Sequence, residues 1–389
     1  MKKTFLIGSV LLAFAYPLAN FLPPTNADVL NIAQNPPKTT PKSKPLPQVK
    51  PKPKTQDNPT INPNENNQKP DVSPISNPQI QPSISLKSRI EVINTGVNPK
   101  IPLRLTPKVN QTEKAKLTLN VDTQVLLKNK SVPTPKMPQL LVTLETTVTN
   151  VEKNGNIGFK FTISDAQVIN DKNTPEKIVK SITENIKQIE GFGGNFVVDN
   201  QGNPKSSKFN FPKQTNPMLQ QLVEQINSSV QQIAGPLPTE SVGVGAKWNV
   251  IQNMSSSMIT FDQTTTYEIV SLKDGKATLK VGLKQTAPPQ NLRLPGLPPR
   301  SNFAVKSYTA TGEGQVMMTL NQLLPISSDI KMTSNIDGQL TLPVSPNQKK
   351  PNQPDKTDLP SNQKKSEQPD KTDLPLTIKL MINAMIKSE

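Results

Sequence analysis

Much of the chain alternates between apolar and polar residues. Period-two alternation is typical of β-strands that bury one face. The stretches that show it are 117–125, 140–148, 157–163, 264–272, 276–285, 307–320 and 326–336. Asn154-Gly155 and Asp274-Gly275 each separate two such stretches, and residues 199–202 separate 196–198 from 208–211. These turns predict antiparallel hairpins. We therefore expect an antiparallel sheet that begins near Arg89.

Two segments have helical periodicity instead. In the first, about 174–190, Thr174 is a capping residue, Pro175 suits the first turn and Gly191 ends the helix. In the second, about 216–234, Asn216 and Gly235 have the same roles. Both carry an apolar stripe. The order of elements predicts an α+β fold, with a mainly antiparallel curved sheet covered on one face by the two amphipathic helices.

The N-terminus has the layout of a secretory signal. Lys2 and Lys3 precede an apolar run, Phe5–Tyr16, and small residues lead to a cleavage site after Ala27. We expect residues 1–27 to be a signal peptide and the protein to be exported to the periplasm or the extracellular cell envelope. The alternative is an uncleaved N-terminal helix that anchors the protein, since Phe5–Leu22 is nearly long enough to span a bilayer.

Composition divides the rest of the chain. Residues 28–86 are rich in Pro and Lys and predict a disordered linker. The β-rich domain is expected over 87–344. Residues 345–375 contain two near-copies of one polar segment, which predicts a disordered loop. Alternation resumes over 376–389, which predicts a final strand that returns to the domain as the partner of 336–344.

Two residue types are absent, cysteine and histidine. Their absence excludes disulfides, thiolate or histidine metal sites and Ser-His-Asp catalysis. We expect no catalytic site, no metal and no cofactor. The formal net charge of +16 favours an anionic envelope polymer or membrane surface as partner. The alternative is that the linker lysines are only solvated. No nucleic-acid partner is expected.

Three motifs invite chemical interpretations. Gly243-Val244-Gly245 could begin a phosphate loop, but it precedes a strand pattern, so we expect a structural turn of Gly243 and Gly245 that places Trp248 in the core. Ser328 and Lys331 have Ser-x-x-Lys spacing, yet on a strand they would point to opposite faces. Paired carboxylates could serve a glycosidase, and the sequence offers Asp165, Asp262 and Glu268.

Methionines gather toward the C-terminal strands, and such residues suit a wall that accepts variable apolar ligands. The alternative is ordinary core packing. The residues expected to line an apolar site between helices and sheet are Ile182, Ile186, Leu222, Ile226, Met318, Met332 and Met381.

The segment Pro236–Trp248 resembles a family of uncharacterised exported bacterial proteins. Residues 264–268 and the turn Gly312-Glu313-Gly314 strengthen the resemblance, which spans about 88–387 without the duplicated loop. It implies a β-rich domain of unknown function. The pattern of two helices on a sheet is also similar to periplasmic lipoprotein-carrier folds, which bind acyl chains; that similarity concerns the fold alone.

Three functions follow as hypotheses. The first is non-enzymatic binding of a lipid or other apolar or amphiphilic ligand. The second is a structural or adaptor role, in contact with wall polymer, an anionic membrane or a protein partner. The third is a carboxylate-dependent hydrolase.

Overall fold

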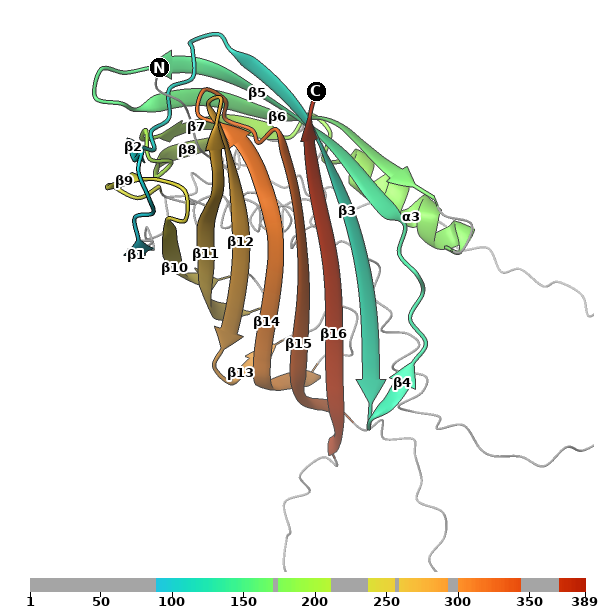
Figure 1. Ribbon diagram of the computed structural model, residues 1–389. Helices are drawn as coiled ribbons and strands as arrows, with labels where there is room; N and C mark the ends of the chain where they lie inside the picture. The colour runs from blue at the N-terminus through green and yellow to red at the C-terminus, as the bar shows by residue number, and fades with distance from the viewer. Residues whose placement is uncertain (1–88, 171–173, 211–236, 256–258, 293–299, 344–370) are drawn as a thin grey trace, which may run out of the picture.

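The computed structural model describes residues 89–170, 174–210, 237–255, 259–292, 300–343 and 371–389 (Figure 1). Strands contain 67% of these residues and helix only 5%. The expected α+β fold with two covering helices is therefore wrong, because the described part is a nearly all-β protein with a single helix.

The elements follow one another in two groups. The first group is β1 (Arg89–Asn94), β2 (Ile101–Pro102), β3 (Thr112–Leu127), β4 (Lys130–Val132), β5 (Gln139–Val151), β6 (Ile157–Ile169), α3 (Glu176–Lys187), β7 (Gly193–Val198) and β8 (Pro204–Asn210). The second is β9 (Ser241–Val242), β10 (Lys247–Ser255), β11 (Thr260–Lys273), β12 (Lys276–Ala287), β13 (Gln290–Leu292), β14 (Asn302–Thr319), β15 (Ser327–Pro343) and β16 (Lys371–Ser388).

All but two of the strands form one antiparallel sheet. Its main order is β1-β10-β11-β12-β14-β15-β16-β3-β5-β6-β7-β8, with β13 paired to β14 and β4 to β3. The remaining strands, β2 and β9, pair with each other. Strand β16 lies between β15 and β3. Every residue of β15 has a register partner on β16. Figure 1 shows the long strands β12, β14, β15, β16 and β3 side by side in a curved layer.

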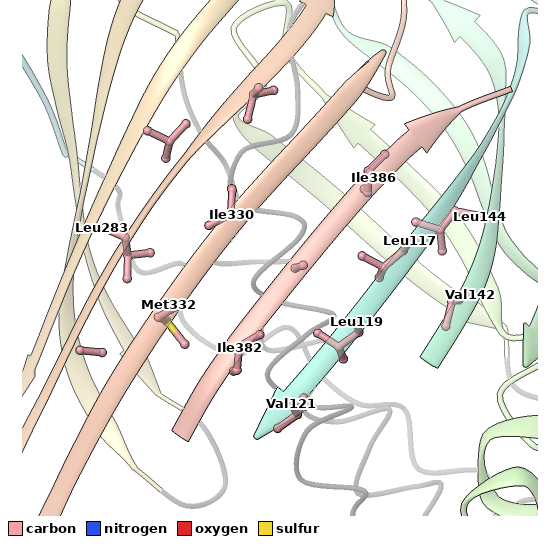
Figure 2. Close-up of a cluster of buried hydrophobic side chains, with 14 of the residues drawn as sticks. Leu117, Leu119, Val121, Val142, Leu144, Leu283, Ile330, Met332, Ile382 and Ile386 are labelled. Carbon is pink, nitrogen blue, oxygen red and sulfur yellow. The ribbon is translucent and has the colours of Figure 1, made fainter. Parts of the chain in front are cut away.

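One face of this sheet, here called the inner face, is apolar and buried. It consists of alternate residues on β10, β11, β12, β14, β15, β16, β3, β5 and β6. Alternation along each strand keeps the apolar side chains on this face. Figure 2 labels ten of them, Leu117, Leu119, Val121, Val142, Leu144, Leu283, Ile330, Met332, Ile382 and Ile386.

The sheet curls so that the β7–β8 hairpin at one edge contacts the segments beside β1 at the opposite edge. The backbone N–H of Leu105 donates to the carbonyl of Asn200 at 2.6 Å, and that of Leu237 donates to Gln201 at 2.9 Å. Leu105 and Leu237 belong to segments that flank the β2–β9 pair, which lies next to β1 and β10. The hydroxyl of Thr106 bonds to the carbonyl of Leu320 in the β14–β15 connection at 3.1 Å. We call this end of the sheet the closed end.

Asp199 organises the β7–β8 turn at the closed end. Its Oδ1 accepts from the backbone N–H groups of Gln201 at 3.0 Å and Asn203 at 2.9 Å, and its Oδ2 lies 3.1 Å from Lys205 Nζ. Burial raises the pKa of the Asp199 carboxyl, but hydrogen bonds from Asn203, Lys205 and Gln201 outweigh burial and hold the pKa below its usual value. The carboxylate is thus the form that the folded turn stabilises.

Replacing Asp199 by Asn should lower the free energy of unfolding by about 1–2 kcal/mol at pH 7, because bonds to a charged acceptor are lost. The folded-state pKa is depressed, so this stabilisation is present above the unfolded pKa and disappears as the pH falls through the folded value. Urea unfolding at pH 7 and pH 3 measures it. A difference between wild type and D199N that grows on acidification would contradict this assignment.

The helix α3 contacts β6 and does not cover the face of the sheet. Ile182 and Ile186 are its buried residues, and the cap residue is Pro175, with no side-chain cap hydrogen bond. The expected cap, Thr174, is buried just before it. The helix ends at Lys187, with Gln188 as its cap residue, and Gly191 lies beyond this end with φ +77°. The helix expected over 216–234 lies outside the described residues. No helix of the described segments is long and apolar enough to cross a membrane.

Candidate functional site

A row of neutral polar side chains crosses the apolar inner face. Gln252 on β10 pairs in register with Gln263 on β11, and Gln263 pairs with Gln285 on β12. The row continues through Ala310 on β14 to Ser334 on β15. The strand pairing therefore aligns residues that are up to about eighty positions apart in the sequence.

Hydrogen bonds join Gln263 and Gln285, in the middle of the row, to each other and to Thr265 and Tyr308. Tyr308 Oη donates to Gln285 Oε1 at 2.5 Å, Gln285 Nε2 donates to Gln263 Oε1 at 2.7 Å, and Gln263 Nε2 donates to Thr265 Oγ1 at 3.3 Å. All four side chains are buried. Such a network fixes the orientation of both amides, because each oxygen has a donor and each nitrogen an acceptor. We call these four residues, with Gln252 and Ser334, the polar row.

Ser334 differs from its neighbours in the polar row. Its side chain is fully buried, and its Oγ has no hydrogen-bond partner in the described structure. A buried hydroxyl without a partner costs about 1–3 kcal/mol. Ala310 separates it from Gln285 along the row, so a methyl group stands between two hydrogen-bonding side chains.

Charge is nearly absent from the inner face. On the strands that form it, Glu113 of β3 is the one charged residue at an inner position. Its carboxylate accepts from the backbone N–H of Leu323 and of Leu324, at 2.8 and 2.6 Å, and from Gln111 Nε2 at 2.8 Å. Burial raises the pKa of Glu113 more than these hydrogen bonds lower it. Glu113 therefore fastens the β14–β15 connection to β3 at the closed end.

The residues expected to line an apolar site fall into three groups. Met318 and Met332 are buried on the inner face, and Ile182 and Ile186 are buried on α3 beside β6. Met381 is 48% exposed and lies on the other face of β16, away from Met318 and Met332. Its side chain points to the same face of β16 as Lys379 and to the opposite face from Ile382. Leu222 and Ile226 lie outside the described residues.

The glycine segment before β10 forms a tight turn. Ala246 N donates to the carbonyl of Gly243 at 3.0 Å, and Gly245 has φ +80°. A Cβ at Gly243 would lie 1.8 Å from the carbonyl oxygen of Val97, so no side chain fits there. Trp248 follows, buried and stacked on Tyr267 with ring centroids 5.5 Å apart. The segment positions an aromatic core residue.

The candidate catalytic groups do not converge. Asp262 accepts from Asn253 at 2.8 Å, Glu268 pairs with Lys247 at 3.0 Å, and Asp165 lies on β6 beside α3. Ser328 is buried on the inner face, whereas Lys331 is exposed on the outer face. In the described ranges, no three acidic side chains are grouped as a metal site requires.

An open polar cleft lies on the outer side, where β3 and β5 diverge. The two strands pair only as far as Leu119 and Leu140, and β4 pairs with β3 from Val125 onward. The cleft between them has a volume of about 230 Å³. Its lining includes Asn120, Asp122, Lys136, Met137, Gln139 and Ile169.

Comparison with protein families bears on a segment of the chain that contains most of the polar row. Residues 185–322 match the DUF6263 family. DUF6263 is a family of unknown function, and the match fits the expected uncharacterised β-rich domain. The DUF6263 match includes Gly243–Trp248, Gln263, Gln285 and Tyr308, but not Ser334. No curated protein matches the chain. The similarity to lipoprotein-carrier folds is not confirmed.

Proposed function

We propose that the β-rich domain binds an uncharged amphiphilic molecule along the inner face of its sheet and catalyses no reaction. The observation that carries the proposal is the polar row on a largely apolar face. The apolar part of such a ligand would contact the aliphatic side chains of β12, β14, β15, β16 and β3. Its polar part would meet the polar row.

The chemistry of the inner face favours a neutral ligand. Burying a charged group without a partner is expensive, and the inner face has no cation to compensate a phosphate or carboxylate. Glutamine, tyrosine and serine side chains instead bond to hydroxyl, ester or amide groups. A monoacylglycerol or diacylglycerol has this combination of parts. Export to the cell envelope, which the N-terminal sequence predicts, would bring the protein near such molecules.

Native mass spectrometry of the full chain, with organic extraction of what it carries, tests the proposal. We expect a neutral lipid to co-purify, and added diacylglycerol to bind in preference to anionic phosphatidylglycerol. A clean mass with no uptake of either lipid would refute ligand binding. Uptake of phosphatidylglycerol alone would refute the role given to the uncharged face.

Ser334→Ala separates a ligand contact from a packing role. We expect this change to raise the free energy of unfolding of the lipid-free chain by about 1 kcal/mol, because it removes an unpaired buried hydroxyl. We expect it also to weaken diacylglycerol binding about tenfold, since the ligand loses a hydrogen bond. Urea unfolding and lipid titration measure the two effects. Ser307→Ala, an exposed hydroxyl on β14, is the control and should change neither. Unchanged lipid affinity in S334A would remove Ser334 from the site.

A second candidate function, contact with another protein, is favoured by exposed apolar residues at the β1–β2 corner. Ile93, Val97 and Val244 are 58, 66 and 40% exposed, and Val97 N donates to the carbonyl of Val244. An exposed apolar cluster of this kind is typical of contact surfaces. This function becomes the leading one if the lipid experiments give a clean, ligand-free mass.

A further inference from the structure

We propose that the open cleft between β3 and β5 binds a neutral saccharide unit. This inference concerns the outer side of the sheet and is independent of lipid binding on the inner face. It is carried by three features of the cleft: paired carboxamides, an apolar wall and a gap in the strand pairing.

The carboxamides come from three elements. Gln139 Nε2 at the start of β5 donates to Asn120 Oδ1 of β3 at 2.9 Å. This bond fixes both amides, so that Asn120 Nδ2 stays available as a donor and Gln139 Oε1 as an acceptor. Asn170, just after β6, also lines the cleft. A hydroxyl group both donates and accepts, so it can bridge the nitrogen of Asn120 and the oxygen of Gln139.

The gap in the strand pairing adds backbone groups to the same wall. Thr134 Oγ1 donates to the carbonyl of Thr123 at 2.6 Å, so the peptide groups of Thr123 face the cleft side of β3. Val121 lies two residues earlier and faces the same side with its backbone. Its side chain is buried, so its backbone lines the cleft. Along 120–124, β3 thus has peptide groups that no strand on this side pairs with.

The apolar wall distinguishes a sugar from an ion. Met137 and Ile169 line the cleft, and Ile169 is 42% exposed. A saccharide ring has hydroxyls at its edge and C–H groups on its faces, which matches carboxamides on one side and thioether and aliphatic groups on the other.

Charge disfavours an anionic ligand. The lining includes the carboxylate of Asp122, which accepts hydrogen bonds from hydroxyl groups but repels the negative charge of phosphate. Lys136 is the one cation of the lining, and it already has an interaction partner. The volume of about 230 Å³ is below that of drug-sized pockets. One sugar ring fits this description, with the rest of a chain in solvent.

The test uses the full chain labelled with ¹³C in its methionine methyl groups. Met137 reports on the cleft, whereas Met318 and Met332 report on the inner face. We expect chitotriose or maltotriose to shift the Met137 signal saturably and to leave Met318 and Met332 unchanged. Inorganic phosphate should not shift Met137. A saccharide response confined to Met318 and Met332, a phosphate response at Met137, or no saturable response to either sugar up to about 20 mM would overturn the proposal.

Variants locate the contact. Gln139→Ala should weaken sugar binding at least tenfold, the loss expected for about 1.4 kcal/mol of hydrogen bonding. Asp122→Asn, which preserves shape at an exposed position, should weaken it about threefold and guards against misfolding of the first variant. Asn335→Ala, an amide on the outer face of β15, is the matched control. Unchanged affinity in both cleft variants would show that the sugar binds elsewhere.

Discussion

Replacing Trp248 by alanine should lower the free energy of unfolding by about 3–5 kcal/mol, the cost of emptying a large aromatic site in a packed core. Trp248 is almost completely buried and stacks on Tyr267, its register partner on β11. Its own strand, β10, lies between β11 and the edge strand β1. The cavity would therefore loosen this edge of the sheet. Urea unfolding followed by circular dichroism measures the loss.

Two further variants make the result specific. Val270→Ala removes a 43% exposed side chain from β11 and should change stability by less than about 0.5 kcal/mol. Trp248→Phe keeps an aromatic ring and removes an indole N–H that has no hydrogen-bond partner in the described part of the chain, so its cost should be smaller than that of alanine. Equal costs for alanine and phenylalanine would mean that ring packing does not hold Trp248 in place.

Replacing Glu113 by glutamine should cost about 2–4 kcal/mol at pH 7. In the glutamine variant, the amide oxygen can still accept from Leu323 and Leu324, but an N–H₂ group replaces the oxygen that accepts from Gln111 Nε2 and Leu323, and the charge that strengthens these bonds is lost. The β14–β15 connection would then be held less tightly to β3. Amide hydrogen exchange at Leu323 and Leu324 should accelerate along with the loss in urea stability.

The pH dependence of this effect has a defined sign. Because the folded-state pKa of Glu113 is raised by burial, its stabilising contribution is full below the unfolded pKa and declines as the pH rises through the folded value. The difference in unfolding free energy between wild type and E113Q should therefore narrow from pH 4 to pH 7. Glu145→Gln is the control, since Glu145 is half-exposed and paired with Lys114 at 3.3 Å. A difference that widens with rising pH would contradict the raised pKa.

Local pattern predicted most of the strands in this sheet. Alternation over 276–285 and 326–336 corresponds to β12 and β15, and the Asp274-Gly275 turn joins β11 to β12. Alternation works here because one face of each strand is buried, so a polar residue at an inner position is penalised. The two predicted stretches 326–336 and 336–344 form one continuous strand, β15, which pairs with β16.

The same pattern did not predict whether a helix covers the face of the sheet. An apolar stripe on a helix shows that one side is buried but not against which surface, and α3 packs beside β6 and not over the sheet. The curl of the sheet depends on hydrogen bonds between distant segments, such as Leu105 with Asn200. Nothing in the local sequence around either residue specifies that contact.

The residues of the polar row were likewise only partly predictable from the sequence. Gln263 and Gln285 look like surface residues in sequence, and only strand order and register join them to Tyr308. Alternation along a strand does give usable information. Gln285 is two residues from Leu283 and so points to the same face, whereas Met381 is next to Ile382 and points to the opposite face. Alternation therefore indicates that Gln285 is inside and Met381 outside. The orphan hydroxyl of Ser334 has no counterpart in sequence, because it depends on the atoms around it.

The central position of β16 affects how the protein is made. One side of the sheet runs from β1 through β10 to β15 and the other from β3 to β8, and β16 is the strand that joins them. It is also the last described strand to leave the ribosome. Until β16 has been synthesised, β3 and β15 each have a long edge with no partner strand, and such edges can pair with other chains. We expect nascent chains to depend on chaperones, and the continuous sheet to form only after translation of residues 371–388.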